Sequence, residues 1–245
     1  MGIYRELRAA GITTRAAVRL TGMSRATVTR KPRPPLWVVP ARLGASHVVG
    51  VDIGGEFVTP EDDALDVMLL TADLSHLDQV TALSEQRFDV VLFLQSIGYA
   101  EDQVATLRAA RQLIKDDGIL VIARSSPCAS PSNAPSVMVG LGTAYHSSAA
   151  HTYPSGWNDK ILVSHRTNTF SDMINTVSEA GFRSDLAVEP QLSDQQKAAY
   201  PHKQAWLDKY IGIILFRARP LSPANQSRIH HRYPATRRNP VDNDG

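Results

Sequence analysis

Two short runs of consecutive apolar residues stand out in the middle of the chain, at residues 90–94 (VVLFL) and 119–122 (ILVI). A run that is apolar throughout is typical of a strand covered on both faces in a parallel sheet. Between the two runs, apolar residues recur at helical spacing over residues 104–114. The pattern predicts a strand, a helix and a second strand within residues 88–123.

The expected helix ends at the polar stretch 115–118 (KDDG), where Gly118 is able to take a positive φ. A parallel unit of this kind crosses over right-handed, which places the loop after its first strand at the carboxyl edge of the sheet. Open α/β sheets bind ligands at that edge. Gln95 and Tyr99, which lie in this loop, are therefore expected to face a binding site.

Similar patterns extend the prediction to the rest of the chain. Strands are expected at residues 48–52, 67–70, 186–189 and 210–217, and helices at residues 75–83, 172–180 and 194–200. Thr169 or Ser171 is expected to cap the helix at 172–180, and Gly181 to end it. The alternation of strands and helices indicates one α/β domain with appendages at its ends.

The first residues have a different pattern. Thr13 or Thr14 can cap a short helix through residues 15–20, Gly22 makes a turn, and Ser24 can cap a second helix. This outline predicts a helix-turn-helix within residues 1–33, followed by a proline-rich linker.

Residues 22–30 (GMSRATVTR) resemble the N-terminal helix-turn-helix of insertion-element transposases. The resemblance implies that four side chains face the major groove of DNA: Ser24, Arg25, Thr27 and Arg30. The alternative is an appendage that has no DNA partner.

Charge is divided unevenly along the chain. The net charge is +2, but residues 1–33 carry +7 and residues 217–245 carry +4, so the residues between them are acidic. Any contact with nucleic acid is therefore expected at the termini, and solvated tails without a partner are the alternative. Proline, asparagine, arginine and aspartate dominate residues 220–245, which predicts a disordered tail.

The sequence contains no apolar run of about 18 residues and no secretion signal, which predicts a cytoplasmic protein without a membrane span. Cys128 is the one cysteine and cannot form an internal disulfide. The pair His230-His231 is too short a cluster for a metal site.

Four ordered segments carry a resemblance to a known family: ARLGASHVVGVDIGG, FDVV with LRAARQLIKDDGILVIA, HRTNTFSDMINTVSEAGFRSDLAVEP, and IGIILFRARP. They resemble the class I S-adenosylmethionine-dependent methyltransferases over residues 41–219. The resemblance implies a Rossmann-like sheet with an antiparallel last strand, S-adenosylmethionine as the cofactor, and methyl transfer to an acceptor that the sequence does not identify. It places a methyltransferase-like domain at residues 36–219.

The resemblance also implies roles for five residues. Asp52 accepts hydrogen bonds from the ribose hydroxyls, Ile53 lies against the adenine ring, Asp73 and Leu74 recognise the adenine edge, and Gln95 lies beside the transferred methyl group. Other interpretations are open for both carboxylates. Asp52 is also a plausible turn residue at a strand end, and Asp73 a helix cap, a role compatible with binding adenine.

Residues 124–160 are rich in serine, proline, alanine and glycine and have no sustained period. In the family this segment often covers the acceptor, so Tyr145, His151 and Trp157 are expected to shape the acceptor pocket, together with Tyr99 from the loop after residues 90–94. His146 or His151 is also a candidate general base, although a lone histidine in a loop is more often solvated.

One family feature is missing from the sequence. The glycine-rich turn that follows the first strand has no match before Asp52, and the eight residues between Val39 and Val48 are too few for a loop and a helix. The first strand and glycine loop are therefore expected to be missing or degenerate. A rival hypothesis follows, in which a non-catalytic methyltransferase-like protein binds DNA through its basic termini.

Overall fold

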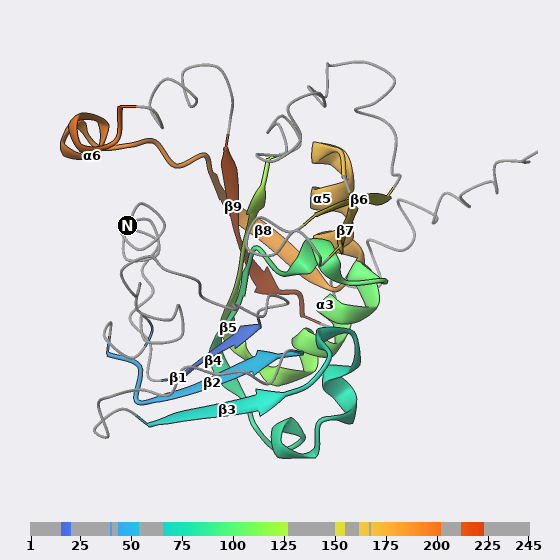
Figure 1. Cartoon of the computed structure of the whole chain (residues 1–245). Coiled ribbons are helices and arrows are strands. Elements are labelled where there is room, and N and C mark those ends of the chain that lie inside the picture. The colour runs from blue at the N-terminus through green and yellow to red at the C-terminus, as the bar shows by residue number, and fades with distance from the viewer. Residues whose placement is uncertain are drawn as a thin grey trace, which may run out of the picture.

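A computed structural model describes residues 16–20, 40, 44–53, 66–126, 150–154, 162–166, 168–201 and 212–222. These residues form a seven-stranded sheet with helices packed on one side, a short helix at residues 194–199 that stands apart from the sheet, and a separate two-stranded hairpin (Figure 1). The expected α/β fold with a Rossmann-like sheet is confirmed.

The order of the strands across the large sheet is β3-β2-β1-β4-β5-β9-β8. Their bounds are Ala16–Leu20 for β1, His47–Asp52 for β2, Val67–Thr71 for β3, Phe88–Leu94 for β4, Ile114–Ser125 for β5, Phe182–Val188 for β8 and Ile213–Pro220 for β9. Strands β1 to β5 are parallel, and β9 runs antiparallel to both β5 and β8. The predicted antiparallel last strand is confirmed.

The remaining elements are short helices and the hairpin. The 3-10 helices are η1 (Leu74–Gln79), η2 (Thr81–Leu83) and η3 (Ile97–Tyr99), and the α-helices are α3 (Gln103–Leu113), α5 (Phe170–Glu179) and α6 (Asp194–Ala199). The hairpin joins β6 (Ala150–Pro154) to β7 (Leu162–Arg166) in antiparallel register.

Side-chain caps fix where the two longer α-helices begin. The Asp102 carboxylate accepts a hydrogen bond from the backbone N–H of Ala105 at 2.9 Å, at the start of α3. Thr169, one of the two predicted caps of α5, forms a reciprocal pair with Asp172, each accepting the other's backbone N–H at 3.0 Å. Gly181 ends α5 with a φ of +88°, as predicted.

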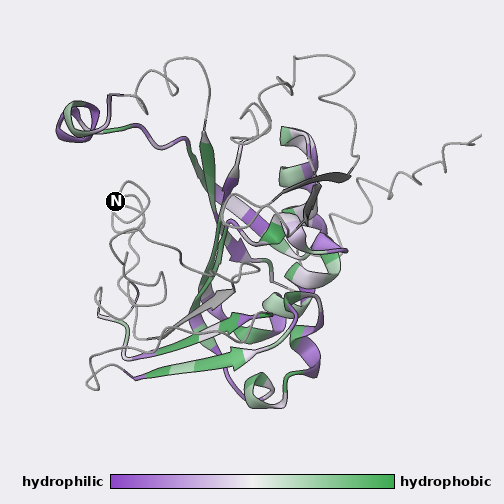
Figure 2. Ribbon diagram, viewed as in Figure 1, coloured by the Kyte–Doolittle hydropathy of each residue, from purple (hydrophilic) through white to green (hydrophobic). Residues whose placement is uncertain are grey.

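The main hydrophobic core lies between the sheet and the helices. Strand residues such as Val91 and Phe93 pack there against Leu107 of α3 and Val177 of α5, all at most 2% exposed. The other face of the sheet carries a second cluster that includes Val90 and Val121, to which no described helix contributes a residue. Hydrophobic residues accordingly follow the strands (Figure 2). The continuous apolar runs are explained by burial of both faces.

The helix predicted through residues 15–20 is wrong, because residues 16–20 form β1. This strand lies in the middle of the sheet and pairs in parallel register with β2 on one side and β4 on the other. A segment of five residues has only a weak intrinsic preference for helix or strand. Residues 16–20 form a strand because β2 and β4 provide backbone hydrogen-bond partners on both sides. The expected absence of a first strand is corrected by the same observation. The place of the glycine loop, residues 21–39, lies outside the described residues.

The predicted role of Gly118 is also wrong. Helix α3 ends at Leu113, β5 begins at once at Ile114, and the φ of Gly118 is not positive. A Cβ at this position would lie 2.6 Å from a side-chain carbon of Ile114 and 3.1 Å from the carbonyl oxygen of Asp89. Glycine fits here because the register of β4 against β5 shifts and crowds this position, from Ile114 and Lys115 of its own strand and from Asp89 of β4.

The predicted disordered tail cannot be compared with the structure, because residues 223–245 lie outside the described residues. No helix within the described residues combines the length and the apolar character needed to cross a membrane.

Candidate functional site

Polar side chains gather at the carboxyl edge of the parallel strands. Strand β2 ends at Asp52, which pairs with Thr71 of β3, and β4 ends at Leu94, which pairs with Ala123 of β5. The residues that directly follow these strands therefore share one edge of the sheet. Asp52, Asp73 and Gln95, predicted separately, all lie there.

Asp52 and Ile53 differ sharply in exposure. Asp52 is 8% exposed, and its backbone carbonyl accepts a hydrogen bond from the N–H of Ala72 at 3.1 Å. Ile53 is 59% exposed, although it is a large apolar residue. A flat apolar ring placed against Ile53 would remove that surface from water.

Asp73 begins η1 and is half-buried. Its Oδ1 accepts a hydrogen bond from the backbone N–H of Ser75 at 2.8 Å, so the predicted capping role is confirmed. An ionised carboxylate has about four acceptor positions, and one cap leaves room for a second donor. The side chain of Leu74 is buried in the core, which leaves only its backbone for recognition.

Gln95 has a backbone conformation that costs energy. Its φ is +60°, and among the described residues it is the one non-glycine residue with a positive φ. Its N–H donates to the carbonyl oxygen of Ala123 at 2.7 Å, which ties the end of β4 to β5. Strained residues of this kind cluster at functional sites. Tyr99, four residues later in η3, is half-buried.

A buried polar cluster at the end of β5 was not predicted from the sequence. Arg124 Nη2 donates to Asn168 Oδ1 at 3.0 Å, and its Nη1 contacts Gln103 Oε1 at 3.4 Å. Gln103 Nε2 donates to the same oxygen of Asn168 at 3.2 Å. All three side chains are at most 8% exposed. The signal in the sequence is an arginine placed directly after the apolar run of β5.

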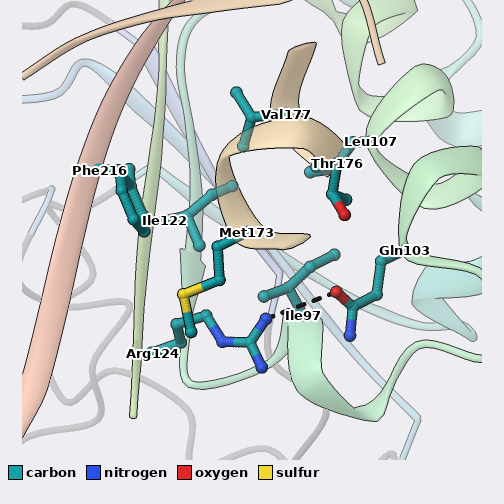
Figure 3. A pocket seen from close by; sticks show the side chains of 9 residues that line it. All are labelled: Ile97, Gln103, Leu107, Ile122, Arg124, Met173, Thr176, Val177 and Phe216. Carbon is teal, nitrogen blue, oxygen red and sulfur yellow. Dashed lines mark hydrogen bonds between the residues drawn. The ribbon is translucent and has the colours of Figure 1, made fainter. Parts of the chain in front are cut away.

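Burial lowers the pKa of Arg124 to about 10, and the negative charge of Asp172 partly opposes this shift. A small cavity next to Arg124 has room for about one water molecule. Figure 3 shows the guanidinium at one end of this cavity and apolar side chains along its walls. The lining residues are Ile97, Gln103, Leu107, Ile122, Arg124, Met173, Thr176, Val177 and Phe216. The cavity is too small for a nucleoside, so it is not the cofactor site.

The β6–β7 hairpin lies beside the same edge, because β7 contacts η3. His151 belongs to β6 and pairs in register with His165 of β7. Tyr145 and Trp157 lie outside the described residues.

The helix-turn-helix prediction is not supported, because its expected first helix is strand β1. The side chains proposed to read DNA lie outside the described residues: Ser24, Arg25, Thr27 and Arg30.

Comparison with known proteins shows which proteins share this fold. Residues 36–122 match the family described as a methyltransferase domain. A structure from Listeria monocytogenes, described as an S-adenosylmethionine-dependent methyltransferase, aligns with a TM-score of 0.65 at 15% identity, covering 90% of this chain and 97% of its own. An S-adenosylmethionine-dependent methyltransferase from Mesorhizobium loti aligns with a TM-score of 0.64 at 21% identity, covering 89% and 98%.

A third solved structure contains a bound ligand. The 1,6-didemethyltoxoflavin-N1-methyltransferase of Burkholderia thailandensis, bound to 1,6-didemethyltoxoflavin and S-adenosylhomocysteine, aligns with a TM-score of 0.54 at 14% identity, covering 90% and 77%. No curated protein matches the chain in sequence. At these identities the likeness concerns the fold. The family match indicates a methyltransferase domain, and the fold is that of the S-adenosylmethionine-dependent methyltransferases it aligns with.

Proposed function

We propose that this protein transfers the methyl group of S-adenosylmethionine to a small-molecule acceptor, with the cofactor bound along the carboxyl edge of β2, β3 and β4. The observation that supports this most directly is the arrangement at that edge. One carboxylate ends β2, a second begins η1, and the exposed Ile53 lies next to the first. The arrangement suits a ligand with a diol, a flat ring and a polar ring edge.

Three contacts would hold the nucleoside. The Asp52 carboxylate can accept both vicinal O–H groups of a ribose at once. Ile53 offers an apolar surface to one face of adenine. Asp73 can accept an N–H of the adenine amino group with an acceptor position that the cap does not use, and the backbone N–H of Leu74 can donate to a ring nitrogen.

In this proposal, the residues of the site promote methyl transfer by positioning the two reactants. When bound, the cofactor supplies a methyl carbon already activated by its sulfonium sulfur. The protein then has to hold the acceptor in line with that carbon and exclude water, so a dedicated acid or base is not required. The strained φ of Gln95 fixes where its side chain leaves β4, and we place that side chain beside the methyl group.

The acceptor side is proposed to lie at η3 and the β6–β7 hairpin. Tyr99 is half-buried in η3, and β7 lies against this helix. His151 in β6, together with Tyr145 and Trp157, would complete the pocket. A small-molecule acceptor is favoured because the methyltransferase from Burkholderia thailandensis, which shares the fold, has 1,6-didemethyltoxoflavin as its bound small molecule.

Calorimetry with S-adenosylhomocysteine tests the proposal. The wild-type protein should bind it, and Asp52→Ala should weaken binding about 10-fold to 100-fold, the usual effect of losing a charge-assisted hydrogen bond. Asp66→Ala is the matched control, because Asp66 lies before β3 at the opposite edge, where it pairs with His47 at 2.8 Å. The control should bind within about twofold of wild type.

An absence of heat from the wild-type protein at millimolar ligand would contradict the cofactor assignment. Equal affinity in the Asp52→Ala variant and the wild-type protein would contradict the assignment of the ribose to Asp52.

A further inference from the structure

The two ends of the connection between β5 and α5 meet at one hydrogen bond. Arg124 is next to the last residue of β5, and Asn168 directly precedes Thr169, the cap of α5. The two side chains are 44 positions apart in sequence and are joined by the 3.0 Å bond from Arg124 Nη2 to Asn168 Oδ1. The guanidinium therefore links the end of β5 to the residue that precedes the cap of α5.

Gln103, the first residue of α3, adds a third element to this junction. Its amide oxygen lies 3.4 Å from Arg124 Nη1, and its amide nitrogen donates to Asn168. Figure 3 shows Arg124 reaching from β5 toward Gln103, below the first turn of α5. One side chain thus joins a strand end to the starts of two helices.

The base of the β6–β7 hairpin is close in sequence to Asn168, the residue that Arg124 and Gln103 both contact. That base is the pair Ala150 and Arg166, and Asn168 follows Arg166 by two residues. The hairpin returns to the sheet edge through β7, which lies against η3. Helix η3 follows the strained Gln95, so the position of β7 bears directly on the acceptor side of the proposed site.

Burying an arginine is a costly way to join these elements. An apolar side chain of similar volume often stabilises a core equally well or better, because it has no charge to remove from water. The guanidinium instead makes its hydrogen bonds directional, because its planar group fixes the positions of the N–H donors. The arrangement therefore serves to place Asn168 more than to increase stability.

We propose that Arg124 is a positioning residue, which holds Asn168 and thereby keeps β7 against η3 on the acceptor side of the site. The assignment of that side to the acceptor depends on the function proposed above. The mechanical part of the inference does not, because it concerns only contacts within the protein.

Amide hydrogen exchange of the full chain tests the inference by comparing β7 with β4. In Arg124→Met, exchange of the β7 amides should accelerate about 10-fold, because the bond from Arg124 to Asn168, two residues after the base of the hairpin, is lost. The amides of β4, in the centre of the sheet, should keep their wild-type rates. Affinity for S-adenosylhomocysteine should stay within about twofold of wild type, since its proposed contacts lie at β2, β3 and β4.

A matched pair at Asn168 provides a second test that leaves Arg124 in place. Asn168→Asp keeps an acceptor oxygen for the guanidinium, so β7 should stay protected. Asn168→Leu has similar volume without that oxygen, and β7 exchange should again accelerate about 10-fold. A purely space-filling role would predict the reverse, with the apolar variant tolerated better. If Arg124→Met does not fold, as judged by circular dichroism, the Asn168 pair alone decides the outcome.

Two results would overturn the proposal. One is unchanged β7 exchange in Asn168→Leu, and the other is equal acceleration in β7 and β4, which would mean that the cluster only stabilises the whole domain. Failure of the wild-type protein to bind S-adenosylhomocysteine would instead count against the proposed function, and the exchange comparison would be unaffected by it.

Discussion

The two halves of the sheet differ in what surrounds the polar groups at the carboxyl edge. At β2, β3 and β4, the buried Asp52 adjoins Ile53, which is 59% exposed, and Asp73 is half-buried. At β5, Arg124 and its two carboxamide partners are buried and hydrogen-bond to one another. The same edge thus offers surface to a ligand on one side and joins structural elements on the other.

This difference teaches that a polar residue after a parallel strand is not by itself a sign of a binding site. Burial alone does not decide its role, because Asp52, Gln103 and Asn168 are each 8% exposed. What differs is the neighbourhood: Asp52 adjoins the exposed Ile53, whereas Gln103 and Asn168 hydrogen-bond within the cluster around Arg124. The following substitutions sharpen the contrast between β3-β2-β1-β4, where we propose that the cofactor binds (the cofactor half), and the other half, β5-β9-β8.

The largest effect is expected in β4, which borders both halves. Phe93 is fully buried in the main core, so Phe93→Ala should lower the free energy of unfolding by about 3–5 kcal/mol. Urea unfolding followed by circular dichroism measures this, with Met68→Ala on the edge strand β3 as the control. Met68 is 37% exposed, and its truncation should cost less than about 1 kcal/mol. Two separate transitions in Phe93→Ala would show that the halves unfold independently.

A pair of helix caps separates stability from binding. Asp73→Ala and Thr169→Ala each remove a cap and should each lower the free energy of unfolding by about 1 kcal/mol. Only Asp73→Ala, in the cofactor half, should also weaken S-adenosylhomocysteine binding, by about 10-fold. Urea unfolding and calorimetry give the two readouts, and equal affinities in both variants would remove Asp73 from the site.

Relief of strain is expected to act in the opposite direction. Gln95→Gly should raise the free energy of unfolding by about 0.5–1 kcal/mol, because glycine adopts a positive φ without steric cost. It should also lower affinity for S-adenosylhomocysteine, since the side chain that we propose to lie beside the cofactor's sulfur is lost. Gln95→Ala is the control, which keeps the strain and removes most of the side chain. Loss of stability in Gln95→Gly would argue against strain at this position.

The smallest effect is expected far from the edge, at Asp185 in β8. Burial alone would raise the pKa of Asp185, but hydrogen bonds from Arg217 at 2.7 Å and Arg219 at 2.8 Å outweigh it and lower that pKa. A carboxyl with a lowered folded pKa stabilises the fold above its unfolded value of about 4, and this stabilisation is lost as the pH falls through the folded pKa. Asp185→Asn should therefore cost less than about 1 kcal/mol at pH 7.

That difference should vanish in acid, where the wild-type carboxyl is protonated and resembles the amide. Thermal unfolding of both proteins across the acid range measures it. A difference that persists at low pH would show that Asp185 acts through packing.

Much of the fold could be predicted from local pattern. The runs around β4 and β5, the cap at Thr169 and the stop at Gly181 are properties of neighbouring residues, and the structure has them where the sequence indicated. The same reasoning placed Asp52, Asp73 and Gln95 after strands that share an edge. It also identified Asp73 as a cap, because the capping signal is contained within three residues.

The failures share a cause, which is that they depend on residues far apart in the sequence. Residues 16–20 have no strand pattern of their own. They form a strand because β2 and β4 provide backbone hydrogen-bond partners on both sides. Gly118 is crowded by Ile114 and Lys115 of its own strand as well as by Asp89, in an irregular stretch that exists only where β5 pairs with β4. In both cases the tertiary structure overrides local preference.

By itself, the sequence determined the parallel units and the row of residues at the carboxyl edge, because hydrophobic period and turn chemistry are short-range. The antiparallel last strand came from the family resemblance. Only the tertiary structure decided that β1 completes the centre of the sheet and that Arg124 meets Gln103 and Asn168. Hydrogen bonds between residues 21 to 65 positions apart leave no trace in local spacing. They form only when the strands and helices that carry them have been brought together.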